Sequence, residues 1–208
     1  MNKGLENDKV SICGEICSEF IFNHEIYGEK FYKTIVKIDR LSDKSDFIPV
    51  MLSERSIDVA VNHIGEKVHI EGQFRSFNRF EGSVNKLELY VFAKEIVFIN
   101  AACVVAHNNY ISLNGVICRE PTCRVTPSGR EIADVMLAVN RPYGKSDYIP
   151  CICWGRNAVF ADGLEVGTRC RLTGRIQSRE YIKRLPDETE ELRTAYEVSA
   201  SSIELVEE

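Results

Sequence analysis

The sequence has 208 residues, of which 44% are hydrophobic and 27% are charged, and its formal net charge is −5. These proportions are typical of a soluble globular protein and exclude a disordered or membrane chain. No stretch approaches the roughly 20 apolar residues of a membrane-spanning helix, and the first residues lack the apolar core of a signal peptide, so we expect a cytoplasmic protein.

The chain repeats itself at an offset of 101 residues. Residues 10–19 align with residues 111–120, and the segment Lys-Ser-Asp-Phe-Ile-Pro at 44–49 aligns with Lys-Ser-Asp-Tyr-Ile-Pro at 145–150. A repeat of this length is the size of a whole small domain. We therefore predict two similar domains, over residues 1–99 and 109–208, joined by a linker over residues 100–108.

Within each repeat, apolar residues mostly alternate with polar ones, which is the period of β-strands with one buried face. In the first repeat this pattern predicts strands at 10–17, 31–40, 46–52, 66–76 and 86–99, with a short helix within 54–62. In the second repeat it predicts strands at 110–118, 131–141, 147–154, 168–178 and 194–206, with a short helix over 156–164.

Five strands with a helix between the third and fourth are typical of the OB-fold, a small Greek-key barrel that often binds oligonucleotides. Glycines inside the strand patterns suit the bends that close such a barrel. The predicted fold class is therefore all-β, with two tandem OB-fold five-stranded Greek-key barrels. The glycines in question are Gly14, Gly72, Gly115 and Gly174.

Charge is distributed unevenly along the acidic chain. Residues 109–186 contain twelve Lys or Arg against seven Asp or Glu, whereas residues 187–208 contain one Arg and eight acids. Residues 1–108 carry thirteen basic and sixteen acidic residues. A basic patch is the feature that a nucleic-acid backbone requires, so the second domain is the better candidate for binding one.

The fourth predicted strand of the second domain alternates basic and apolar residues. Its apolar set, which includes Cys170 and Leu172, must face the core, so the other set faces outward. Cations that follow the phosphates are one requirement for binding single strands. A merely solvated face remains the alternative. The outward arginines are Arg169, Arg171, Arg175 and Arg179.

The third predicted strand of this domain places Tyr148 and Trp154 on one outer face, about 20 Å apart at roughly 3.3 Å per residue. Aromatic faces on which bases stack are the second requirement for binding single strands. Packing on a partner subunit is the alternative, because aromatic residues are enriched at interfaces. The neighbouring candidates are Arg141, Tyr143 and Lys145 in the preceding loop and Tyr181 in the following hairpin.

The first domain keeps Phe47 at the position of Tyr148 but has Ser53 at the position of Trp154. Its fourth strand is less basic and carries Glu71 on the outer face. We therefore expect either a weaker second site or a structural barrel. The candidates for this possible second site are Lys33, Lys37, Arg40, Phe47, Arg75, Phe77 and Arg79.

Cysteine and histidine spacing gives no sign of a metal site, since no Cys-x-x-Cys pair occurs among the eight cysteines. Most of the cysteines lie among Ile, Val and Leu in strand patterns, which predicts buried free thiols. No phosphate-binding loop and no catalytic arrangement of Ser, His and Asp is present. We expect no metal, no cofactor, no small-molecule substrate and no enzymatic activity.

The second repeat resembles the bacterial single-stranded DNA-binding protein family. The resemblance covers about 95 residues and depends on a set of motifs in a specific order. The motifs are Asn109-x-x-Ser-Leu113-x-Gly115, Pro121, Thr126-Pro-Ser-Gly-Arg130, Leu137-Ala-Val-Asn-Arg-Pro-Tyr143, Asp147-Tyr-Ile-Pro150, Trp154-Gly155 and Gly174-Arg-Ile-Gln-Ser-Arg-x-Tyr181.

The resemblance implies an OB-fold that binds and protects single-stranded DNA without reading its sequence, in replication, recombination or repair. It implies aromatic contacts at Tyr148 and Trp154, and also at Tyr181. Family assemblies usually contain four barrels, so a homodimer is expected, in the cytoplasm and associated with the nucleoid. An OB-fold protein-interaction module, such as a primosome-like accessory protein, and single-stranded RNA binding are the alternatives.

Family members usually continue beyond the barrel into a flexible tail with an acidic, Phe-ended tip that recruits other enzymes. Here the sequence ends at Glu208, directly after the last predicted strand. Recruitment by such a tail is therefore not expected.

Overall fold

The structure is a computed structural model, of which residues 7–81, 84–99, 108–184 and 188–206 are described. Strands dominate this described part, which confirms the predicted all-β class. Most of the predicted linker, residues 100–107, lies outside the described residues. The strands of the first half are β1 (Asp8–Ile16), β2 (Ile21–Ile26), β3 (Glu29–Asp39), β4 (Ser45–Ser53), β5 (Lys67–Glu81) and β6 (Val84–Phe98).

The second half follows the same order, with a helix between its third and fourth strands. Its elements are β7 (Asn109–Val125), β8 (Glu131–Asn140), β9 (Ser146–Trp154), α1 (Arg156–Asp162), β10 (Arg169–Arg184) and β11 (Glu190–Leu205), with a short 3-10 turn over Pro142–Gly144.

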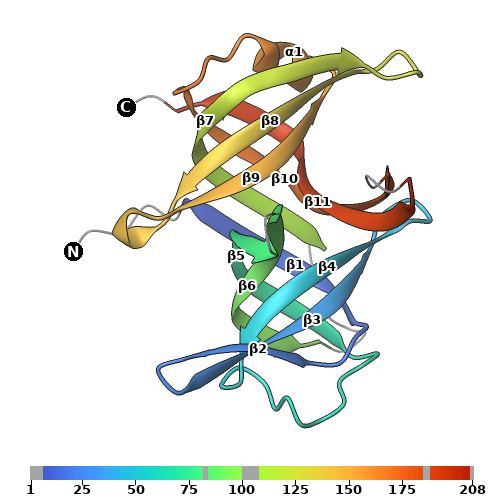
Figure 1. Ribbon diagram of the computed structural model, residues 1–208, viewed down its shortest axis with the longest axis vertical. Helices are drawn as coiled ribbons and strands as arrows, with labels where there is room; N and C mark the ends of the chain where they lie inside the picture. Colours follow the sequence, from blue (N-terminus) through green and yellow to red (C-terminus); the bar gives the residue numbers. More distant parts are fainter. Residues whose placement is uncertain (1–6, 82–83, 100–107, 185–187, 207–208) are drawn as a thin grey trace.

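The strands pair into two closed rings, stacked one above the other in Figure 1. In the first ring, β1 pairs with β3, β3 with β4, β4 with β6, β6 with β5 and β5 with β1. In the second ring, β7, β8, β9, β11 and β10 pair in the same order and return to β7. Strands three and five are the parallel pair in each ring, so the sequence repeat is a repeat of topology.

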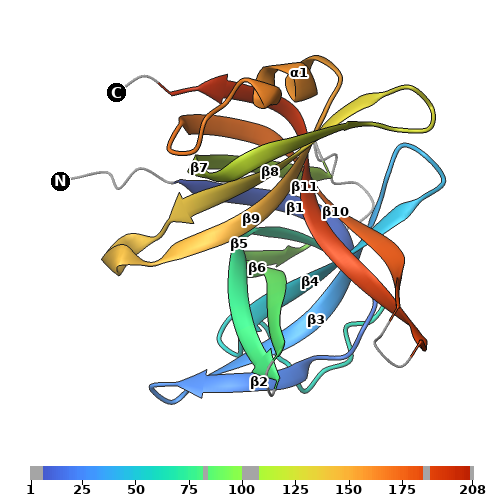
Figure 2. The same cartoon turned by 45° about the horizontal axis from the view of Figure 1, so that its top comes forward.

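The rings are joined by strands β1 and β7, which run antiparallel, side by side between them (Figure 2). Val10 pairs with Ile111, its own counterpart at the offset of 101 residues. β1 and β7 therefore contact each other through equivalent positions, as two copies do in an isologous interface. The two rings are related by an approximate two-fold axis near this pair.

The core is built from alternate apolar positions of the strands, as the period of two predicts. Phe74, Ile12 and Leu113 are among the largest side chains that are fully buried. Cys151, Cys153 and Cys170 are buried free thiols, which agrees with the prediction for them, while Cys17 and Cys118 are only partly buried. Burial is the main cause that raises the pKa of Cys153 to about 12 and of Cys170 to about 11.

The predicted helix of the first domain, within residues 54–62, is wrong: this segment forms a series of turns. Asp58 Oδ1 accepts the backbone N–H of Ala60, and Asn62 Oδ1 accepts that of Ile64. Such local side-chain bonds compete with helical ones and favour turns. The strand β2, which pairs with β3, was also not predicted.

Gly174 is expected to be intolerant of even a methyl group. A Cβ at this position would overlap the backbone carbonyl of Ser199 on β11, at the point where the β10–β11 register shifts. Replacing it, Gly174→Ala, should lower the free energy of unfolding by about 2 to 3 kcal/mol, as overpacking does. Urea denaturation measures this, and Gly163→Ala is the matched control because its Cβ would make only ordinary contacts. Equal losses in the two variants would contradict the prediction.

Candidate nucleic-acid interface

Strand β10 presents basic side chains on its outer face because its alternate residues are held in the core. Cys170, Leu172 and Ile176 are completely buried, whereas Arg169, Arg171 and Arg179 are exposed and Arg175 is partly exposed. The predicted alternation is therefore confirmed. Arg171 forms an ion pair with Glu204 and a hydrogen bond to Asn114.

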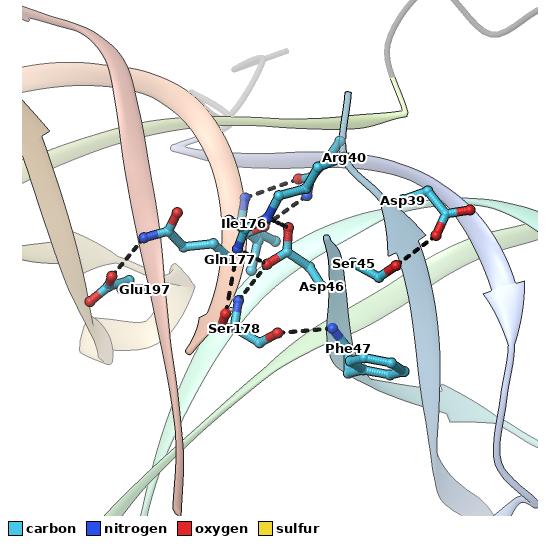
Figure 3. A network of polar contacts seen from close by, with 10 residues as sticks. Asp39, Arg40, Ser45, Asp46, Phe47, Ile176, Gln177, Ser178 and Glu197 are labelled. Carbon is cyan, nitrogen blue, oxygen red and sulfur yellow. Dashed lines mark hydrogen bonds and ion pairs between the residues drawn. The ribbon is translucent and has the colours of Figure 1, made fainter. Parts of the chain in front are cut away.

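Gln177 lies on the same outer face but is only 8% exposed. Its amide nitrogen donates to the carboxylate of Glu197 on β11, 2.6 Å away (Figure 3). The carboxylate of Glu197 is thus bound by Gln177 and does not neutralise an arginine of β10. The outer face of β10 therefore presents the positive charges of Arg175 and Arg179, which lie on either side of Gln177.

Strand β9 carries Tyr148 and Trp154 on its outer face, with exposed fractions of 46% and 39%. Ile152 lies between them on the same face but is only 6% exposed. The aromatic side chains of Tyr148 and Trp154 are thus two separate platforms and do not form one continuous surface. Each is exposed enough for a planar group to stack on it.

The structure places Trp154 in a groove that both rings line. The groove has a volume of about 850 Å³ and contains Trp154, Arg175 and Arg179 of the second ring beside Arg40 and Phe47 of the first. A second hollow of about 600 Å³ adjoins it, because Trp154 and Arg130 line both. We call these two connected hollows the composite groove.

Two cations of the composite groove were not among the predicted site residues. Arg130 follows the hairpin turn of the motif Thr126-Pro-Ser-Gly-Arg130, in which Thr126 Oγ1 accepts the Arg130 N–H. Lys44 lies in the loop that precedes Phe47. Arg130 could have been found from its place in the motif set, whereas nothing in the sequence places Lys44 beside the second ring.

Not all predicted residues meet in this groove. Tyr148, Arg141 and Lys145 lie outside it, and Tyr181 lines another hollow, of about 570 Å³, together with Lys33. The side chain of Tyr143 is outside the described part of the structure. Arg169, Arg171, Lys37, Arg75, Phe77 and Arg79 are also absent from the lining of the composite groove.

Arg141 and Arg40 are held by buried carboxylates. Arg141 binds Asp147, which is 2% exposed, and Arg40 binds Asp46, which is fully buried. The hydrogen bonds to these carboxylates raise the pKa of both guanidinium groups, so both stay charged. Their charges are largely balanced. The exposed cations of the composite groove are Lys44, Arg130 and Arg179, and Arg175 is partly exposed.

The position related to the groove by the two-fold axis is filled. Strand pairing places Phe92 opposite Gln73, where the second ring has Ser199 opposite Arg175. The guanidinium of Arg75 lies 4.0 Å from the centre of the Phe92 ring. A small serine thus leaves space beside Trp154, while a large aromatic ring and an arginine occupy the equivalent space in the first ring.

Metal and membrane features complete the description. No cluster of three or more His, Cys, Asp or Glu residues suitable for a metal ion occurs among the described residues. No helix of the described chain has the length and apolar character needed to span a bilayer.

Comparison with known sequences confirms the family resemblance. Residues 108–206 match the family described as the single-strand binding protein family. A single-stranded DNA-binding protein from Halalkalibacterium halodurans is 36% identical over 107 residues, and one from Oceanobacillus iheyensis is 33% identical over 108 residues. Each alignment covers 48% of this chain, and the chain spans only 61% and 63% of the length of these two relatives.

Comparison with solved structures extends the likeness of fold to nearly the whole chain. The crystal structure of the wild-type single-stranded DNA binding protein from Thermus aquaticus matches with a TM-score of 0.77 over 97% of this chain and 93% of that chain. The sequence identity is 19%. The arrangement of both rings is therefore shared with a known structure, although the sequences have diverged widely.

Proposed function

Because residues 108–206 match the single-strand binding protein family, we propose that this protein binds single-stranded DNA without reading its sequence. The observation that carries the proposal is the composite groove. There Trp154 offers a stacking face, while Arg175 and Arg179 offer charge for the phosphates. Its role is the coating and protection of single strands in replication, recombination or repair, as a binding protein and not as an enzyme.

The proposed architecture is two OB-fold barrels in tandem, one formed by residues 1–99 and the other by residues 109–208. The identical order of strand pairing in the two rings supports it. A five-stranded closed ring with a short helix between strands three and four fits the OB-fold in the second half. We also propose a homodimer, which would bring four barrels together, as assemblies of the family usually do.

We propose that a DNA strand follows one continuous path across both rings and does not occupy two separate sites. Phe47 and Arg40 were candidates for a second site in the first domain, but they line the same groove as Trp154. A strand lying on Trp154 therefore passes Arg175 and Arg179 and reaches Phe47 of the first ring. Tyr148 and Tyr181 lie outside this groove and are proposed as further stacking positions beyond it.

Titration of fluorescent oligonucleotides of dT, rU and duplex DNA at several salt concentrations tests the proposal. We expect a preference for the dT single strand, quenching of Trp154 fluorescence, and a log-log salt slope of about −0.7 for each phosphate neutralised. Absence of binding to single strands at low salt would contradict the proposal and favour a protein-interaction module. Equal affinity for rU would remove the preference for DNA.

Replacing the aromatic ring in the groove, Trp154→Ala, should weaken binding to dT by about tenfold, since stacking contributes roughly 1 to 3 kcal/mol per base. Phe160→Ala is the matched control. Phe160 is also 39% exposed, but it lies on α1 and not in the groove. Direct titration by anisotropy measures both affinities. If the two variants bind equally, Trp154 is not a stacking position.

A further inference from the structure

Each ring of strands holds an aromatic residue of the other ring through one serine. The aromatic residues are Phe47 on β4 and Tyr148 on β9. Ser178 belongs to β10 of the second ring, and it contacts the residues that open β4 in the first ring. Figure 3 shows Ser178 directed toward Asp46 and Phe47, with Arg40 beside them. Strand β10 reaches this point because it extends beyond the barrel of its own ring.

Ser178 makes three bonds across the boundary between the rings. Its hydroxyl accepts the backbone N–H of Phe47 at 2.9 Å, and its own N–H donates to the Asp46 carboxylate at 2.8 Å. Its carbonyl accepts from the Arg40 guanidinium at 3.5 Å. Asp46 and Arg40 also bind each other. The bonds that join Ser178, Arg40, Asp46 and Phe47 therefore hold the start of β4 in one position.

Ser76 on β5 of the first ring repeats the arrangement for the second ring. Its hydroxyl accepts the backbone N–H of Tyr148 at 2.8 Å, and its N–H donates to the Asp147 carboxylate at 2.5 Å. Its carbonyl accepts from Arg141 at 3.1 Å. Ser76 and Ser178 are counterparts in the sequence repeat, so the contact is reciprocal.

The residues held in this way are aromatic residues proposed to stack on bases. The backbone N–H groups that the two serines bind belong to Phe47 and Tyr148, whose side chains are 47% and 46% exposed. A bond to the backbone fixes the direction of the Cα–Cβ bond and therefore limits the directions in which the exposed aromatic side chain can point. The two aromatic residues thus depend on the opposite ring for their orientation.

We infer that Ser178 and Ser76 are positioning residues for single-stranded DNA, each acting through the aromatic residue of the opposite ring. This inference rests on the proposed function. Binding by either barrel then requires the boundary between the rings to be intact.

Amide hydrogen exchange tests the positioning without any DNA. In Ser178→Ala the amide of Phe47 loses its acceptor, so its exchange should become about fivefold faster, while the amide of Tyr148 should be unchanged. Ser76→Ala should produce the opposite pattern. An equal rise at both amides in either variant would show general loosening of the fold and would overturn the inference.

A double-mutant cycle then tests the link to DNA. Ser178→Ala should weaken dT binding by about fivefold in the wild-type background. It should have almost no further effect in a Phe47→Ala background, because the residue through which it acts is gone. In a Tyr148→Ala background the effect of Ser178→Ala should return in full, which a merely structural role would not explain.

Ser146→Ala is the matched control for these serine variants. The Ser146 hydroxyl donates to Asn140 of its own ring at 2.9 Å, two residues from Tyr148, so its loss removes a bond of similar length that does not cross between the rings. We expect unchanged dT affinity. Wild-type binding with no effect of either serine would refute the positioning role alone, whereas absent wild-type binding would refute the proposed function and leave the exchange result to stand separately.

Discussion

Arg141→Ala should lower the free energy of unfolding by about 3 kcal/mol, which is the low end of the range for breaking a buried ion pair. The carboxylate of Asp147 is 2% exposed, and without Arg141 it would keep the hydrogen bond from the N–H of Ser76 but lose its ion pair. The same guanidinium also binds the Ser76 carbonyl on the other ring. The variant therefore removes an ion pair and a contact between the rings together.

Chemical denaturation measures the loss, and the exposed pair of Arg124 and Asp134 provides the control. These side chains are 55% and 36% exposed and form the same type of two-pronged contact within one ring. Arg124→Ala should cost less than about 1 kcal/mol, as surface pairs do. If Arg141→Ala costs no more than Arg124→Ala, the Arg141 pair does not stabilise the fold in the way that its burial indicates.

Much of the fold could be predicted because strands have a short period and the chain is repeated. Alternation on β10 was enough to place Cys170 and Leu172 in the core and the arginines outside. The analogy between the repeats failed at residues 54–62, where a helix was expected, because Asp58 and Asn62 bind nearby backbone groups and the segment forms turns. In the second repeat the amide of Asn157 donates instead to the distant carbonyl of Ser201, and the segment forms the helix α1.

The candidate site was only partly predictable, since it depends on how the two rings meet. The sequence indicates Trp154 and the β10 arginines, but it gives no sign that Phe47 faces the same groove. That contact follows from the pairing of β1 with β7, which centres on Val10 and its counterpart. Local patterns do not encode which strands pair between two domains.

The two rings differ in charge at the counterpart positions Asp8 and Asn109. Asn109 is bound on both sides of its amide by the backbone of Ile176, with distances of 2.7 and 2.9 Å. Its counterpart is Asp8, which is 4% exposed and has no partner for Oδ1 among the described residues. Burial, reinforced by the charge of Asp147, raises the pKa of Asp8 from 3.8 to about 7, against a backbone bond from Phe74 and the charges of Arg75 and Lys94.

This shift predicts that stability falls as the pH rises. Between pH 3.8 and about 7 the unfolded chain releases the Asp8 proton, whereas the folded chain keeps it. The unfolded state is favoured over this interval by about 1.4 kcal/mol per pH unit, and the loss is complete above about pH 7. The folded protein at pH 8 therefore contains an ionised, buried carboxylate at the position whose counterpart is the neutral amide of Asn109.

Asp8→Asn should recover most of this loss, because an amide at position 8 can donate to the first ring as Asn109 does to the second. We expect the variant to exceed the wild type by about 3 kcal/mol at pH 8, with a difference that shrinks steadily toward pH 4. Urea denaturation at each pH measures it. Asn109→Asp is the reciprocal control and should destabilise the protein at pH 8 but not near pH 4. A gain for Asp8→Asn that is independent of pH would mean that the carboxyl group ionises normally in the folded state, and that the two counterpart positions differ in packing and not in charge.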